Sequence, residues 1–371
     1  MRTRDGVLEY QKTLGDTTPE IKKIDVTDPI SAIWLEFQGT NGTTSNKGNF
    51  LSDVIAKIEV VDGSDVLVSM RMDEAEALQW YKTGVPPAIF PSEWASGAQR
   101  HGVYILFGRY LWDTEYALNP ARFKNLQLKV TPNIAAVRAA AADTAFATGT
   151  LKYSAVLKLM EDVGMPSRFF MQKQIESWTG AASGEKRVDL PIDYPYRMLM
   201  MRLYLAEYDI GELCTDLKLT CDTDKFIAFS RKVDELDAEA LARFGRSCVK
   251  HDMFFSHQDT VRLLHNMEPD CRPHYQSSAT PTIIGIDWQW SSAAKFNCYD
   301  KDGVADTTDR KYTMVEEGHA LHATLPIPFG RMQDASDLFD APKYKKVELV
   351  LTQGGAASGV GSVVVEQVRP N

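Results

Sequence analysis

Two cysteine–histidine pairs are the residues of this sequence whose spacing most resembles a metal site. Cys248 and His251 form one C-x-x-H pair, Cys271 and His274 form another, and six of the seven histidines lie between positions 251 and 322. Zinc takes four nitrogen or sulfur ligands in a tetrahedron, and two such pairs could supply them. The residues that usually surround zinc knuckles are missing here, so we favour a polar loop region with free cysteines over a structural zinc site.

A group of aspartates resembles a calcium loop in composition. Asp300, Asp302, Asp306 and Asp309 are close in sequence, and calcium requires several carboxylate and carbonyl oxygens that converge on one point. The spacing does not fit the EF-hand loop, which needs glycine at its sixth position. We therefore favour a solvated acidic turn over a calcium site.

A third candidate is a cupin-type metal site made of Glu316, Glu317, His319 and His322. The cupin pattern requires H-x-H followed by glutamate, whereas here the histidines are three apart and the glutamates precede them. On a strand, His319 and His322 would also point to opposite faces. No metal ligand is assigned to these residues.

Trp288 and Trp290 are two residues apart and would share one face of a strand. Such a pair could stack on a sugar, but packing in a core or an interface is the commoner use of tryptophan. The sequence contains no G-x-S-x-G, P-loop or dinucleotide-binding motif in a suitable setting. We assign no catalytic or cofactor-binding residue and expect a protein that is not an enzyme.

Composition narrows the function further. The 371 residues are 44% hydrophobic and 25% charged, which is typical of a soluble protein of two domains. A net charge of -9 argues against a surface that neutralises nucleic-acid phosphates, so we expect no sequence-specific binding of nucleic acid. The N-terminal stretch lacks the apolar segment of a secretory signal, and the five cysteines are expected to be free thiols in a reducing compartment.

The elements that would position these residues are mostly strands. Apolar and polar residues alternate over 126–130, 151–158 and 347–351, and polar turns rich in glycine, asparagine and aspartate occupy 39–42 and 62–65. This period of two is typical of strands with one buried face. Many short strands with few helices indicate sandwiches or barrels.

The sequence predicts a few short helices, two of which lie in corresponding places. One would be capped by Asp73, with Glu76 three residues later in capping-box spacing. The other carries an apolar stripe from Leu236 to Phe244. A third, alanine-rich helix is predicted over about 134–146.

One architectural unit occurs twice in the chain. The recurring blocks begin at Ile58 and Leu217, at Ala75 and Ala238, at Phe107 and Phe329, and at Phe123 and Tyr344. Counted in sequence positions, the first two offsets are 159 and 163, and the last two are 222 and 221. Because the blocks keep their order, we infer a duplication in which the second copy carries an insertion of about 59 residues.

The duplication defines the expected domains. Residues 1–25 have few apolar anchors and are predicted to form a poorly packed N-terminal arm. The first sandwich is expected over 26–164 and the second over 165–371, with a loop-rich insertion at about 249–318. Gly164 and Pro166 break regular structure between the two.

The repeated layout resembles the double jelly-roll major capsid proteins of tailless icosahedral viruses, including membrane-containing bacteriophages. The resemblance rests on the tandem all-β units, on a strand pair followed by a short helix in each, and on the block Gly108–Val130 with its counterpart Gly330–Leu351. It implies an all-β fold of two tandem eight-stranded antiparallel jelly-roll sandwiches, with a few short helices and the insertion in the second.

The resemblance also implies a structural role in the capsid shell of a virion that assembles in the host cytoplasm. Three copies of a fused pair would form a homotrimer that presents six similar rolls as a pseudo-hexameric capsomer. The expected partners are further copies of the chain, neighbouring capsomers, and penton and minor capsid proteins. The insertion would form an outward tower, and the N-terminal arm would face either an internal membrane or a neighbouring capsomer.

Two other functions remain open from the sequence. A tandem jelly-roll protein that binds carbohydrate or cleaves glycans would use Trp288 and Trp290 and the acidic loops. A bicupin-like metalloenzyme would use the histidines near position 320, whose pattern does not fit. Each of these two functions would require a local binding or catalytic site, whereas a capsid protein would use the same fold only for assembly.

Overall fold

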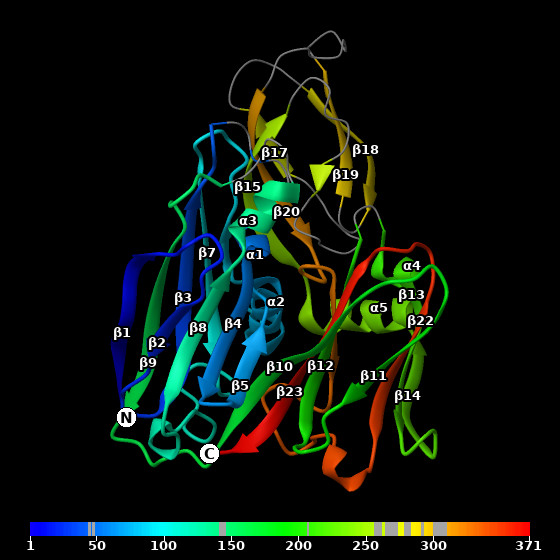
Figure 1. Cartoon of the computed structure of the whole chain (residues 1–371). Coiled ribbons are helices and arrows are strands. Elements are labelled where there is room, and N and C mark those ends of the chain that lie inside the picture. The colour runs from blue at the N-terminus through cyan, green and yellow to red at the C-terminus, as the bar shows by residue number, and fades with distance from the viewer. Residues whose placement is uncertain are drawn as a thin grey trace.

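Two β-sandwiches lie side by side in the computed structural model, with a further group of strands at one end (Figure 1). The structure describes residues 1–43, 46, 49–140, 146–205, 208–255, 262–263, 274–277, 283–290, 293–299 and 310–371, with the side chains of all but 138–140 and 247–317. We call the sandwich within residues 2–161 the first unit. The second unit is the sandwich formed by 168–244 and 324–370, and the insertion lies between these two segments.

The first unit contains nine strands among its described residues. They are β1 (Arg2–Thr13), β2 (Glu20–Lys23), β3 (Ile30–Thr40), β4 (Ile55–Asp62), β5 (Asp65–Met70), β6 (Ala88–Phe90), β7 (Ala98–Leu106), β8 (Leu126–Pro132) and β9 (Lys152–Glu161). Its helices are α1 (Leu51–Val54), α2 (Met72–Thr83), the 3-10 turn η1 (Pro120–Arg122) and α3 (Ile134–Ala140).

The second unit contains eight described strands. They are β10 (Arg168–Thr179), β11 (Gly184–Leu190), β12 (Tyr196–Tyr204), β13 (Cys214–Cys221), β14 (Phe226–Lys232), β21 (Thr324–Pro328), β22 (Val347–Gln353) and β23 (Val360–Pro370). Its helices are α4 (Ile210–Leu213), α5 (Val233–Phe244) and η2 (Ala341–Lys343). The insertion contributes β15 (Ser247–Phe255), β16 (Arg262–Leu263), β17 (His274–Ser277), β18 (Ile283–Trp290), β19 (Ala293–Tyr299) and β20 (Arg310–Gly318).

One eight-stranded sheet passes from the first unit into the second. Its order is β2-β8-β4-β5-β10-β23-β12-β21, and the two units meet where β5 and β10 run parallel, at the pairs Val68–Gln172 and Ser69–Lys173. The five-stranded sheet β1-β9-β3-β7-β6 completes the first sandwich, and the four-stranded sheet β11-β22-β13-β14 completes the second. The strands of the insertion form two separate three-stranded sheets.

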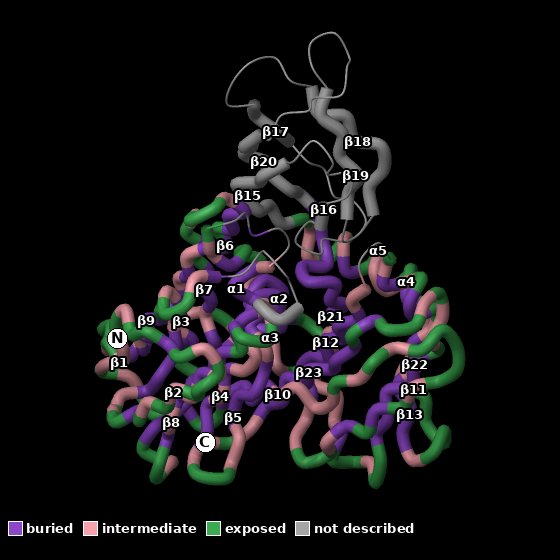
Figure 2. The backbone as a smooth tube through the Cα atoms, turned by 45° about the horizontal axis from the view of Figure 1, so that its top comes forward, coloured by how far each residue is buried: buried purple, intermediate pink, exposed green. Residues whose placement is uncertain are grey.

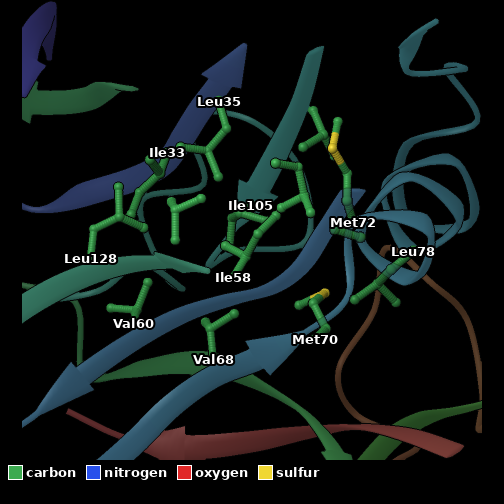
Figure 3. Packing of buried hydrophobic residues seen from close by; sticks show 14 of the residues in the cluster. Ile33, Leu35, Ile58, Val60, Val68, Met70, Met72, Leu78, Ile105 and Leu128 are labelled. Carbon is green, nitrogen blue, oxygen red and sulfur yellow. The ribbon is translucent and has the colours of Figure 1, made fainter. Parts of the chain in front are cut away.

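The core of the first unit explains the alternating pattern in the sequence. Ile33 of β3 and Ile105 of β7 point toward Ile58 of β4 and Leu128 of β8 from the opposite sheet (Figure 3), and each is at most 1% exposed. Because successive side chains of a strand point to opposite faces, alternate apolar residues are enough to fill the space between two sheets. The predicted all-β fold of two tandem sandwiches is confirmed, with nine described strands instead of eight in the first.

The duplication appears element by element. β4 and β13 differ by 159 positions and each follows a one-turn helix, α1 or α4, at the same offset. α2 and α5 both have 12 residues and differ by 161 positions, whereas η1 and η2, like β8 and β22, differ by 221. The step in offset falls between α5 and β21, where the insertion lies. The tandem arrangement therefore extends to nearly every element, and β6 is the additional strand of the first unit.

The segment 1–25 does not form a poorly packed arm. β1 pairs antiparallel with β9 from Arg2 to Thr13, and β2 pairs with β8. β1 is largely exposed because it is the outermost strand of its sheet, which explains the scarcity of apolar anchors. We keep the division of the chain after position 164, between β9 and β10, as a proposal.

The predicted cap of α2 is also wrong. The helix begins at Met72, so Arg71 is the N-cap residue, and the Glu74 carboxylate accepts a hydrogen bond of 2.9 Å from the Arg71 backbone N–H. Asp73 and Glu76 lie inside the helix instead. Of the alanine-rich helix expected over 134–146, the structure shows α3, and residues 141–145 lie outside the described part. None of the described helices is long and apolar enough to cross a membrane.

Candidate functional site

The most unusual concentration of charge lies where the two units meet, around α2. All residues of this helix from Met72 to Lys82 are buried, including four charged side chains and a glutamine. Figure 2 shows buried segments in the middle of the molecule, at α2 and at β12, β21 and β23. Buried charges are costly unless they are paired, so the partner of each decides what the cluster can do.

Glu366 on β23 is the centre of the first cluster. Its carboxylate accepts a hydrogen bond of 2.5 Å from the Lys82 ammonium and another of 3.0 Å from the Arg197 guanidinium. Gln172 Nε2 lies 3.2 Å from the same carboxylate and donates to the carbonyl of Leu106, to which Lys82 also donates. The cluster therefore joins α2 of the first unit to β10, β12 and β23 of the second.

Burial and charge shift the ionisation of this cluster in a consistent way. Burial, together with the nearby positive charge of Arg197, lowers the pKa of Lys82 to about 8. The negative charge of Glu366 only partly opposes this shift. Burial alone would raise the pKa of Glu366, but the charges of Lys82 and Arg197 outweigh it and the pKa is lowered. Two cations thus compete for one buried anion.

A second cluster surrounds the first turn of α2. Glu74 accepts hydrogen bonds from the Ser362 hydroxyl at 2.5 Å and from Gln174 at 3.0 Å, both of the second unit. Burial, followed by the nearby charge of Asp73, raises the pKa of Glu74. Asp73 lies 3.4 Å from the Arg202 guanidinium and 3.1 Å from that of Arg71, and these two cations outweigh burial and lower its pKa.

The third cluster contains two of the seven histidines. His322 Nε2 lies 2.6 Å from one oxygen of Glu76, and His101 Nδ1 lies 2.9 Å from the other. His319 instead contacts Asp237 of α5 at 2.8 Å. The two histidines of the cupin-like pattern therefore contact different carboxylates, and the side chains of Glu316 and Glu317 lie outside the described ones.

The side chains of the other predicted ligands lie outside those that the structure describes. Cys248 and His251 lie on β15 and His274 begins β17, whereas Cys271 and the aspartates Asp300, Asp302 and Asp306 lie outside the described residues. Trp288 and Trp290 lie on β18. No group of three or more potential metal ligands is found among the residues whose side chains the structure describes. The zinc, calcium and sugar-stacking hypotheses remain untested.

A cavity of about 540 Å³ opens to the surface between the ends of α2 and α5. Arg243, Arg331 and Asp334 line it, so it presents charges of both signs at an open rim. We assign no ligand to it. The first two clusters, by contrast, consist of groups that contact one another across the two units, and the third joins the first unit to His322, just before β21. This arrangement is suited to fixing the units in one relative position.

Comparisons by sequence find no relative: no profile of a known protein family matches, and no curated protein matches. Comparison by structure gives full-length similarities. The MCP of STIV, Sulfolobus turreted icosahedral virus, matches with a TM-score of 0.60 at 14% identity, covering 99% of this chain and 96% of that one. The major capsid protein P2 of bacteriophage PM2 matches with a TM-score of 0.55 at 10% identity, covering 100% and 98%. PBCV-1 VP54, which was fitted into a reconstruction of the virophage Sputnik, matches with a TM-score of 0.56 at 10% identity, covering 99% and 93%.

This chain has the double jelly-roll fold. The coverage on both sides is nearly complete, so the likeness includes the order of the two rolls as well as each sandwich. The first unit is the first jelly roll and the second unit is the second. The clusters around α2 are therefore the internal junction of a double jelly roll.

Proposed function

We propose that this chain is a major capsid protein whose homotrimers act as pseudo-hexameric capsomers and tile an icosahedral virion shell. One observation carries the proposal: the whole chain shares its fold with nearly the whole of proteins described as major capsid proteins. The junction supports it, because buried ion pairs across the two rolls favour a tile of fixed geometry. In this proposal the chain has no catalytic activity.

The position and partners of the chain follow from the same proposal. It would reside in the virion shell after assembly in the host cytoplasm, with neighbouring capsomers and with penton and minor capsid proteins as partners. The insertion, at one end of the molecule (Figure 1), would form the outward tower. We no longer assign membrane contact to an N-terminal arm, because residues 2–23 are largely strands of the first roll.

Light scattering and electron microscopy of the purified protein test this function. We expect particles of three chains, roughly hexagonal in outline, that associate into sheets or shells at high concentration. A monomer at every concentration that binds glycans would instead support the carbohydrate-active alternative. Nothing in the described part of the chain favours that alternative at present.

A further inference from the structure

The internal junction of the two rolls has two parts. One is the parallel pairing of β5 with β10, at Ser69 with Lys173. The other is the packing of α2 against the outer face of the sheet β23-β12-β21, where Met200 and Val364 are each 1% exposed and belong to the core of the first roll. Each of these elements has a counterpart in the other roll.

β1 is the counterpart of β10. Both strands begin their roll, both pair antiparallel with its last strand, β9 or β23, and each has a register shift at the same place, between Val7 and Glu9 and between Gln174 and Glu176. Val7 and Gln174 differ by 167 in number, as do Glu9 and Glu176. Gly6 of β1 therefore corresponds to Lys173 of β10.

β14 is the counterpart of β5. Both form a hairpin with the preceding strand, and each hairpin is shifted in register at the same step, before Val61 of β4 and before Thr220 of β13. The strand starts, Asp65 and Phe226, differ by 161 in number, as do the starts of α2 and α5. Ser230 of β14 therefore corresponds to Ser69 of β5.

These two counterparts are open edges. β1 and β14 are each the outermost strand of their sheet and lie on opposite sides of the molecule (Figure 1). Both carry exposed apolar side chains: Val7 is 67% and Tyr10 75% exposed on β1, and Phe226 and Ile227 are each 47% exposed on β14. An open edge with apolar side chains is a template for pairing with another chain.

The matching faces are also only partly covered. α5 buries Val233 and Ala240 alone among its 12 residues, whereas α2 is buried along its length. Trp34 of β3 and Val156 of β9, the counterparts of Met200 and Val364, are only partly buried. Within the chain, α2 packs against the outer face of the sheet β23-β12-β21. The equivalent face, on the sheet β9-β3-β7, is partly exposed, so α5 of another copy can pack against it.

We infer that a second copy of this chain docks through its β14 and α5 onto β1 and the outer face of the β9-β3-β7 sheet, in the same way as the first roll docks onto the second inside the chain. β14 runs parallel to β1 of the neighbour, with Ser230 opposite Gly6. The contact joins different surfaces of the two copies, and three copies close a ring of six rolls. This inference rests on the proposed function and specifies its subunit interface.

A pair of cysteines tests the register. Paired residues of adjacent strands are separated by about 5 Å, which suits a disulfide. Gly6→Cys combined with Ser230→Cys should, after mild oxidation, give covalent dimers and trimers on a non-reducing gel. The control pairs Gly6→Cys with Lys225→Cys, in the turn just before β14 and about 16 Å from Ser230, and should give neither. Cross-linking by the control pair, or none by the matched pair, overturns the register.

A surface substitution tests the interface without cysteines. Ile227→Arg places a charge at the open edge of β14 and should reduce the mass measured by light scattering from three times the 41.5 kDa of one chain to a single chain. The control is Val85→Arg, at a residue that is 59% exposed but outside both edges, and it should leave the trimer intact. A trimer that survives Ile227→Arg contradicts the inference.

The two proposals fail in distinguishable ways. Shells or hexagonal particles without the Gly6–Ser230 cross-link would uphold the coat function and reject this interface. A cross-linked trimer that never forms larger assemblies would uphold the interface and reject the coat function.

Discussion

Replacement of Glu366 by glutamine should show that one carboxylate holds the junction together. The Glu366 and Arg197 side chains are both 0% exposed, and Lys82 is 1% exposed. Arg197 cannot release its proton, so the amide would leave a buried and uncompensated charge, which costs about 3–5 kcal/mol. Lys82 can release its proton, because its pKa is already about 8. Deprotonation of Lys82 at pH 7 adds only about 1.4 kcal/mol to the loss of stability.

Lys82→Met is the matched control for this prediction. Glu366 keeps Arg197 as its partner in that variant, and Gln172 still donates to the Leu106 carbonyl, so we expect a loss of about 1–2 kcal/mol. Both variants would be unfolded in guanidinium at pH 7 and one fixed protein concentration, with tryptophan fluorescence as the signal. A loss for Lys82→Met equal to that for Glu366→Gln, or a loss under about 1 kcal/mol for Glu366→Gln, would refute the reasoning.

Two further predictions concern packing and acid stability. A Cβ atom at Gly102 would lie 2.4 Å from the Trp34 ring, so Gly102→Ala should cost about 1–3 kcal/mol, whereas Gly164→Ala, with nothing within 4 Å, should leave the unfolding midpoint unchanged. Equal midpoints for the two alanine variants would contradict this. The pKa values of Glu76 and Glu366 are lowered despite burial, by His101 and His322 and by Lys82 and Arg197. The stability that these two ionised carboxylates contribute to the folded state is therefore complete above the unfolded pKa of about 4.3, and it is lost as the pH falls through the lower folded values. The melting temperature should drop below pH 4, and less steeply in Glu76→Gln. Parallel plots of melting temperature against pH for the two proteins would argue against this.

Much of the fold could be predicted because the relevant signals are local or repeated. Alternation along each strand shows which side chains enter the core, and the offsets between repeated blocks match those between β4 and β13 and between β8 and β22. The expectation for segment 1–25 is wrong for a physical reason. An edge strand has one neighbour, and the partner of β1, β9, comes at the opposite end of the first roll in sequence. Local composition cannot reveal such a pairing.

The junction could not be predicted, because its signals come from distant residues. Glu74 and Glu76 both lie three residues after a possible helix start, and the sequence alone does not choose between them. What decides between the two helix starts is the contact of the Glu76 carboxylate with His101 and His322 inside the molecule. These histidines lie 25 and 246 positions from Glu76 in the sequence. The charged residues of α2 resemble a solvated helix until the second roll covers them.

The core of the first roll contains residues from far along the chain. Phe169, Met171, Met198, Met200 and Val364 belong to the second roll by sequence but pack in the first hydrophobic cluster. During synthesis from the N-terminus, this core therefore remains incomplete until translation has passed Val364. We expect the two rolls to acquire their final stability together, late in translation, rather than one after the other.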